Sequence, residues 1–125
     1  MPKLETRRVE VKNFQRPDET RMFEGKGRAE VITLAGQQVG CGTFEPGWRW
    51  SNNVKPIAGT ELCEFSHLSY CLSGRIRILM SDGTQEEIGP GDVAAIPPGH
   101  DAEVVGDEAC VLLDFGEFGD YAKRT

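Results

Sequence analysis

Short runs of β-favouring residues, separated by Gly and Pro turn signals, are the feature that most constrains the fold of this chain. From residue 29 on, such runs recur, as in AEVITLA before Gly36 and RIRILM before Asp82-Gly83. Asp-Gly tolerates the positive φ angles of a tight hairpin turn. The chain has 15 Gly and 7 Pro, enough for many turns. Helical spacing is absent, so the pattern predicts an all-β, antiparallel sandwich or barrel.

The division of the chain follows from length and polarity. A chain of 125 residues lies in the size range of one domain with its own core. Residues 1–30 are the most polar part, and we expect them to form an N-terminal arm with outer strands of the same domain. Residues 31–116 should form the β-barrel, and the tail 117–125 should be helical or loose.

Charge and hydropathy narrow the classes of partner. The net charge of -6 and the pI near 4.9 exclude nucleic acid and anionic membranes as favoured partners, because both require a cationic surface. No stretch approaches the roughly 20 apolar residues of a membrane span. The start MPKLETRRVEVK lacks the apolar core of a secretory signal. We therefore expect a cytoplasmic protein whose partner is a small molecule.

Cysteine usage agrees with a reducing compartment. The four cysteines, at positions 41, 63, 71 and 110, contain no CxxC pair. A chain of this length does not need disulfides to hold a core, so we interpret them as free thiols.

A candidate site lies in the run ELCEFSHLSYCL. If this run is one strand, its alternation places Glu61, Cys63, Phe65 and His67 on the same face. A carboxylate, a thiol and an imidazole can together bind Zn(II) or Fe(II) once deprotonated. Alternatively, Cys63 packs as a small buried apolar group, His67 forms an internal hydrogen bond and Glu61 lies at a solvated rim.

Four further positions complete the candidate pocket. His100 follows Pro97-Pro98-Gly99, where an imidazole could line the barrel mouth as a general acid or base or could be a structural turn residue. Trp48 and Trp50 share a face and, with Phe44, form either an aromatic wall for a ligand or ordinary core packing. The expected substrate pocket therefore comprises Phe44, Trp48, Trp50 and Phe65.

The segment from Gly47 to Ala102 resembles the two linked motifs of the cupin superfamily. The second motif is a Gly, five residues, Pro, one residue, Gly, two residues and His, and Gly91, Pro97 and Gly99 match this spacing. Its final His would fall at Ala102, whereas this chain has His100 two residues earlier. The match covers about half of the chain.

The first cupin motif is matched in spacing and not in residue identity. Counting back from Gly74 puts His67 at the motif's Glu and puts Glu61 and Cys63 at its His-x-His pair. The chain has two histidines, so the superfamily's usual set of three His and one Glu cannot form. The resemblance implies a single jelly-roll β-barrel with a variant set of metal ligands, namely Glu61, Cys63, His67 and His100.

The resemblance also implies a range of functions. Similar stand-alone cupins include dioxygenases, isomerases, lyases such as decarboxylases, and cyclases, so we expect a small-molecule enzyme with His67 and His100 as catalytic residues. The cofactor would be Fe, Zn, Ni or Mn, or the site would work without metal by acid-base catalysis. The alternative is a non-catalytic, metal-free ligand-binding or sensing protein. Cupins commonly form dimers through sheet edges and N-terminal strands, which implies a homodimer here.

Overall fold

The computed structural model describes residues 4–115 and 121–123, and the regular secondary structure within them is nearly all β-strand. Two four-residue helices interrupt the succession of strands. In chain order the elements are β1 (Glu19–Met22), β2 (Gly27–Leu34), β3 (Gln37–Phe44), α1 (Trp50–Asn53), α2 (Lys55–Ala58), β4 (His67–Ser73), β5 (Ile76–Met80), β6 (Gln85–Ile88), β7 (Val93–Ile96), β8 (His100–Val104) and β9 (Cys110–Asp114).

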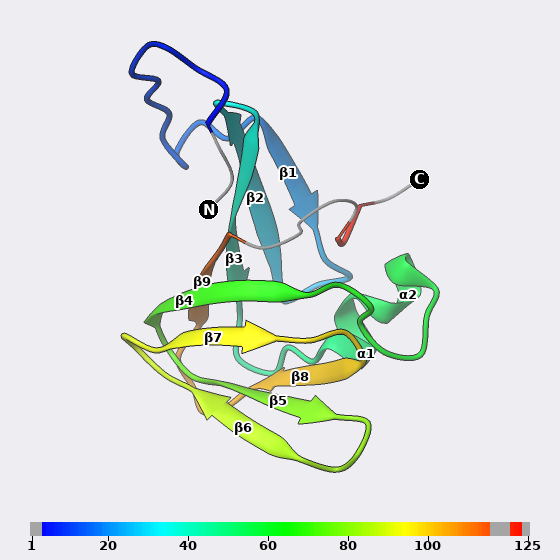
Figure 1. Cartoon of the computed structure of the whole chain (residues 1–125). Helices are drawn as coiled ribbons and strands as arrows, with labels where there is room; N and C mark the ends of the chain where they lie inside the picture. Colours follow the sequence, from blue (N-terminus) through cyan, green and yellow to red (C-terminus); the bar gives the residue numbers. More distant parts are fainter. Residues whose placement is uncertain (1–3, 116–120, 124–125) are drawn as a thin grey trace.

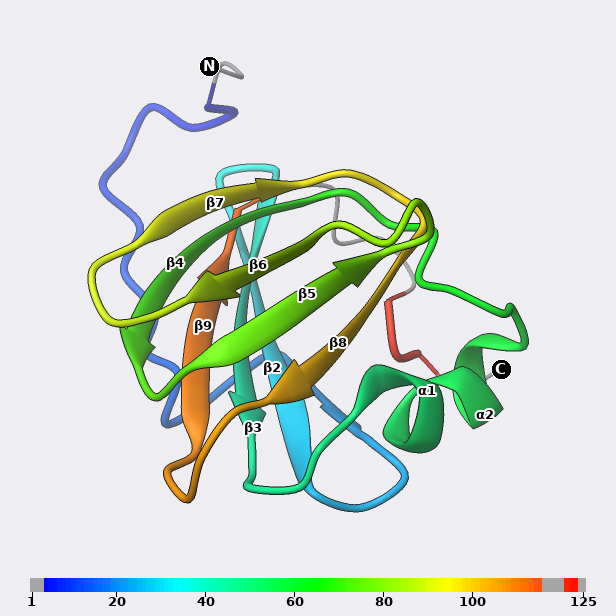
Figure 2. The ribbon, with the colours of Figure 1, turned by 90° about the horizontal axis from the view of Figure 1, so that it is seen from below.

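The strands form two antiparallel sheets (Figure 1). The larger sheet has the order β1-β2-β3-β9-β4-β7 and the smaller one the order β6-β5-β8. Figure 2 shows the smaller sheet lying across the larger one, with α1 and α2 beside one end of β8. The predicted all-β jelly roll is confirmed. Among the described residues the two sheets are not joined by a ladder into a closed barrel.

The core lies between the facing surfaces of the two sheets. In β9 the side chains of Cys110, Leu112 and Asp114 point inward, as the burial pattern of that strand shows. Ile76 and Ile78 of β5 are buried on the smaller sheet in the same alternating manner. Period-two alternation therefore places one face of β5 and of β9 in the core and leaves the other face nearer to solvent.

Two local predictions were wrong. The strand expected from Glu61 begins only at His67, and Cys63, in the preceding loop, forms an isolated bridge with His100 of β8. The chain also contains α1 and α2, although no helical spacing was visible. A four-residue helix is too short to display a 3.6-residue period, so pattern analysis cannot detect it.

The structure describes only part of the two predicted terminal segments, residues 1–30 and 117–125. β1 and the start of β2 lie in the expected N-terminal segment, and β1 is an edge strand of the larger sheet. Of the expected tail, residues 121–123 are described and the rest lies outside the described residues. Neither of the two helices in the described part of the chain has the length or the apolar character needed to cross a membrane.

Candidate metal centre

Cys63, His67 and His100 form a compact group of potential metal ligands. One ligand atom from each lies within 4.8 Å of the others. Cys63 Sγ is 3.6 Å from His67 Nε2, and the ring centroids of His67 and His100 are 5.2 Å apart. Cys63 comes from the loop before β4, His67 begins β4 and His100 begins β8.

Backbone pairing between the loop and β8 brings Cys63 to His100. The Cys63 amide donates to the His100 carbonyl at 2.8 Å, and the Gly99 amide donates to the Cys63 carbonyl at 2.7 Å. His67 reaches the same point because β4 pairs with β7 on one side and β9 on the other. The shift of His100 from the motif position therefore does not keep it away from His67.

Both imidazoles are oriented by acceptors outside the group. His67 Nδ1 lies 2.6 Å from Asp114 Oδ2, and His100 Nδ1 lies 2.7 Å from the Pro97 carbonyl oxygen. Histidines that bind metals typically donate one ring N–H to a carboxylate or carbonyl, which leaves the other nitrogen for the metal. Two imidazoles and a thiolate are ligands suited to Zn(II) or Fe(II). The residues thus fit a metal ion.

The electrostatics of the group favour a thiolate beside an imidazolium. Burial by itself raises the pKa of the Cys63 thiol, but hydrogen bonds from His100 and His67 and their positive charge outweigh it and lower the pKa to about 6. Burial lowers the pKa of His67, but its contacts with Asp114 and Cys63 outweigh that effect and raise it to about 9. A metal ion would therefore meet an ionised sulfur and displace the proton of the His67 imidazolium.

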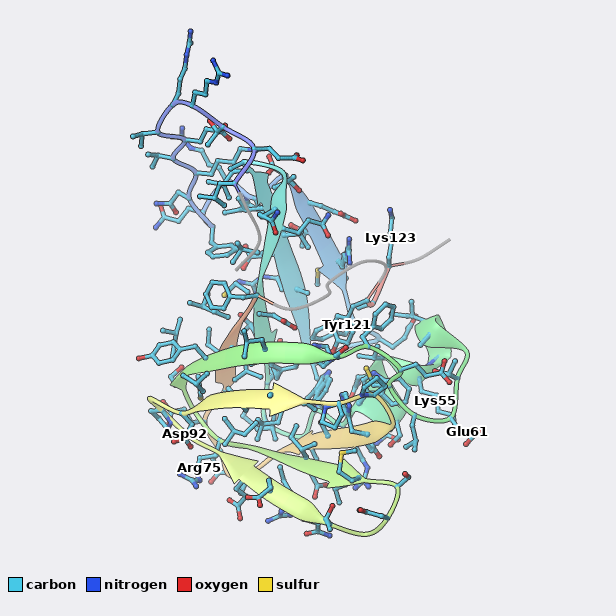
Figure 3. All side chains as sticks on the ribbon, viewed as in Figure 1. Lys55, Glu61, Arg75, Asp92, Tyr121 and Lys123 are labelled. Atoms are coloured by element: carbon cyan, nitrogen blue, oxygen red, sulfur yellow. The ribbon has the colours of Figure 1, made fainter. Side chains whose placement is uncertain are left out.

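Glu61 is not brought to this group. Its side chain is 90% exposed, and its carboxylate pairs with Lys55 Nζ at 2.8 Å. Figure 3 shows this pair on the outer side of α2. Because residues 59–66 form a loop, the strand alternation that placed Glu61 beside Cys63 does not apply there.

Two residues at the site were missed by sequence reasoning. Asp114 holds His67, and the ring of Tyr121 meets the His67 ring edge-on, with centroids 5.2 Å apart. Asp114 could have been identified from the sequence. In the apolar run CVLLD it shares the inward-facing side of the strand, and a carboxylate buried there requires a partner. Tyr121 belongs to a segment without strand or helix periodicity, so no pattern marked it.

The predicted aromatic residues lie in different surroundings. A small inner cavity of about 50 Å³ is lined by both histidines, Asp114, Phe44 and Trp50, together with Tyr121 and apolar core residues. Phe65 instead lines a larger outer cavity of about 480 Å³. Trp48 is buried against Phe44 with ring centroids 4.6 Å apart, and it lines neither cavity.

Comparison with known proteins gives a structural likeness and no sequence relative. No family model and no curated protein matches the chain. Among solved structures, an Acinetobacter protein of unknown function superposes with a TM-score of 0.58 at 15% identity, over 80% of this chain and 90% of that one.

Two further solved structures have named activities. Oxalate decarboxylase from Bacillus subtilis gives a TM-score of 0.59 at 20% identity and covers 94% of this chain, which spans 33% of that enzyme. A sugar phosphate isomerase of the cupin superfamily from Silicibacter pomeroyi gives 0.53 at 20% identity, over 77% of this chain and 68% of that one. At these identities the likeness concerns the fold, and the chain therefore has the fold of the cupin superfamily.

Proposed function

We propose that this protein is a small-molecule enzyme that works through a metal ion held by Cys63, His67 and His100. The observation that supports this most is the orientation of the two imidazoles. Asp114 and the Pro97 carbonyl take one nitrogen of each ring, and the other nitrogen is left for the metal. Three protein ligands with an open position are typical of catalytic metal sites.

The bound metal would supply a Lewis acid for a carbonyl or a site for an activated water. The protein's own residues hold and orient the centre. Asp114 fixes the ring of His67, Cys63 supplies negative charge, and the apolar walls of the inner cavity keep bulk water away. This range of chemistry suits an isomerase, lyase, cyclase or dioxygenase.

The ligand set favours some metals over others. Oxalate decarboxylase from Bacillus subtilis has Mn(II) centres. Manganese prefers oxygen ligands, whereas a thiolate with imidazoles suits zinc or iron. We therefore propose Zn(II) or Fe(II) for this chain, with nickel and manganese as weaker candidates.

A second candidate function uses the same residues without metal. Cys63, His67 and Asp114 form a chain of contacts like that of thiol enzymes, in which an imidazole beside the sulfur is oriented by a carboxylate. The thiolate would then act as a nucleophile or base. In this case the protein binds no metal, and iodoacetamide modifies Cys63 faster than the other three cysteines.

Cobalt substitution tests the first candidate. Co(II) added to metal-free protein should give visible bands and a sulfur-to-cobalt charge-transfer band, because Cys63 supplies a thiolate ligand. Cys63→Ser should remove the charge-transfer band, whereas Cys41→Ser, which changes a cysteine outside the group, should keep it. A charge-transfer band that survives in Cys63→Ser would refute the assignment of Cys63.

The cellular setting follows from general properties. We propose that the protein acts in the cytoplasm, where its four free cysteines stay reduced. With a net charge of -6, it should work on a small molecule without nucleic acid or membrane partners. We also propose that it forms a homodimer.

A further inference from the structure

We infer that the outer cavity, and not the small inner one, binds the body of the substrate, and that this substrate is a largely apolar, ring-bearing molecule. The inference rests on the proposed function for the reaction that follows. The binding step itself is testable without metal.

Volume separates the two cavities. Pockets for small organic molecules usually measure about 300–1,000 Å³. The inner cavity of about 50 Å³ holds a few water molecules, whereas the outer cavity of about 480 Å³ falls inside the usual range. Of these two cavities, therefore, only the outer one is large enough for a substrate of several carbon atoms.

The walls of the outer cavity indicate a planar, apolar ligand. Trp50, Phe65 and Tyr121 supply aromatic surface, and Val54 and Ile57 add aliphatic surface. Aromatic walls favour ring-shaped ligands through stacking and edge contacts. Glu64 and Lys123 also line the cavity, and both are exposed. The aromatic and aliphatic surface therefore favours a largely apolar, ring-bearing ligand.

The outer cavity reaches the candidate metal centre through Cys63. Cys63 lies in its wall, whereas His67 and His100 line the inner cavity. Trp50 and Tyr121 line both cavities and therefore form the partition between them. The backbone of Tyr121, which is labelled in Figure 3, is held in place because its carbonyl accepts a hydrogen bond of 2.8 Å from the buried Arg21. A ligand in the outer cavity thus places one end beside the metal ligands.

Trp50 provides a probe of the outer cavity. Its side chain lines that cavity and is 1% exposed, and its indole N–H has no hydrogen-bond partner among the described residues. Trp48 has the same unpartnered N–H but lies against Phe44 and lines neither cavity, so it serves as an internal reference.

Nuclear magnetic resonance on the two indole N–H groups tests the inference directly. The chain has two tryptophans, and Trp48→Phe assigns their signals. The probe is acetophenone, an uncharged ring with one carbonyl acceptor, and acetate is the comparator without a ring. We expect acetophenone to shift the Trp50 signal in a saturable manner and to leave the Trp48 signal unchanged. Acetate should shift neither. No shift at Trp50, or equal shifts at both, would overturn the inference.

A cavity-filling variant gives the matched control. Ala58→Phe places a ring in the wall of the outer cavity from an exposed position in α2 and should weaken acetophenone binding by about tenfold or more. Asn52→Phe adds the same ring at an exposed position in α1 that does not line the cavity, and should leave binding unchanged. Equal affinity in Ala58→Phe would place the probe elsewhere. Because these titrations use metal-free protein, they can succeed even if the metal proposal fails.

Discussion

At the scale of single residues, the contact between Asp114 and His67 determines how the candidate metal centre is held. In Asp114→Asn, an amide replaces the carboxylate 2.6 Å from His67 Nδ1, so the acceptor that fixes the ring and its tautomer is weakened. Loss of such an outer contact typically costs about 10–100-fold in metal affinity. Competition with a chelator should show a loss of this size. Asp107→Asn, at an exposed loop position, should bind as wild type, and an equal loss in both variants would contradict the role of Asp114.

The thiol of Cys63 gives a residue-scale prediction with pH. In metal-free protein its pKa is lowered to about 6, so the sulfur is ionised at neutral pH. Because this pKa is lower in the folded state than in the unfolded state, ionisation of Cys63 stabilises the fold. This stabilisation is complete above the ordinary thiol pKa of about 8.5, and it is lost as the pH falls through about 6. The ultraviolet absorbance of the thiolate should therefore persist until the pH falls to about 6, and this step should vanish in Cys63→Ser. A thiol that titrates near its ordinary pKa would contradict the geometry around Cys63.

At the scale of elements, the turn between β4 and β5 requires glycine. Gly74 has φ +73, and a Cβ added there would lie 2.3 Å from the Ala109 carbonyl oxygen. Strain and this backbone clash together should make Gly74→Ala less stable by about 3 kcal/mol or more. Gly83 in the β5–β6 turn has φ +91, but a Cβ added there would meet no atom within 4 Å. Gly83→Ala should therefore lose about 1 kcal/mol of stability, from backbone strain alone. Denaturant unfolding measures both, and equal losses would contradict the clash.

The elements also show what sequence patterns could reveal. The alternation in β5 and β9 is visible in the sequence because each strand buries one face, and the Asp-Gly hairpin follows from its turn chemistry. The loop before β4 carried β-favouring residues without forming a strand, which removed Glu61 from the expected group. His100 and Cys63 came together through a bridge between distant segments, and no local pattern encodes such pairing.

At the scale of the whole molecule, the outer face of the larger sheet should be covered by a second copy of the chain. Leu68, Tyr70 and Leu72 of β4 and Val93 of β7 are exposed there, and Tyr70 and Val93 are paired across the two strands. Contiguous exposed apolar surface typically marks an interface. Light scattering should give twice the chain mass of 13.8 kDa.

Variants separate this interface from general association. Leu72→Lys places a charge on the apolar face and should return the mass to 13.8 kDa. Gln38→Lys, at an exposed position near the start of β3, should stay dimeric. A wild-type protein that is monomeric at all concentrations would reject the homodimer.

Metal content of the purified protein tests the central claim most directly. Wild-type protein prepared without a metal-affinity tag should contain about one zinc or iron per chain by elemental analysis. Cys63→Ser, His67→Ala and His100→Ala should each lose this metal, and Glu61→Gln should keep it, because Glu61 lies outside the group. Wild-type protein that holds no metal even after reconstitution, or a metal that survives all three ligand variants, would contradict the proposed centre.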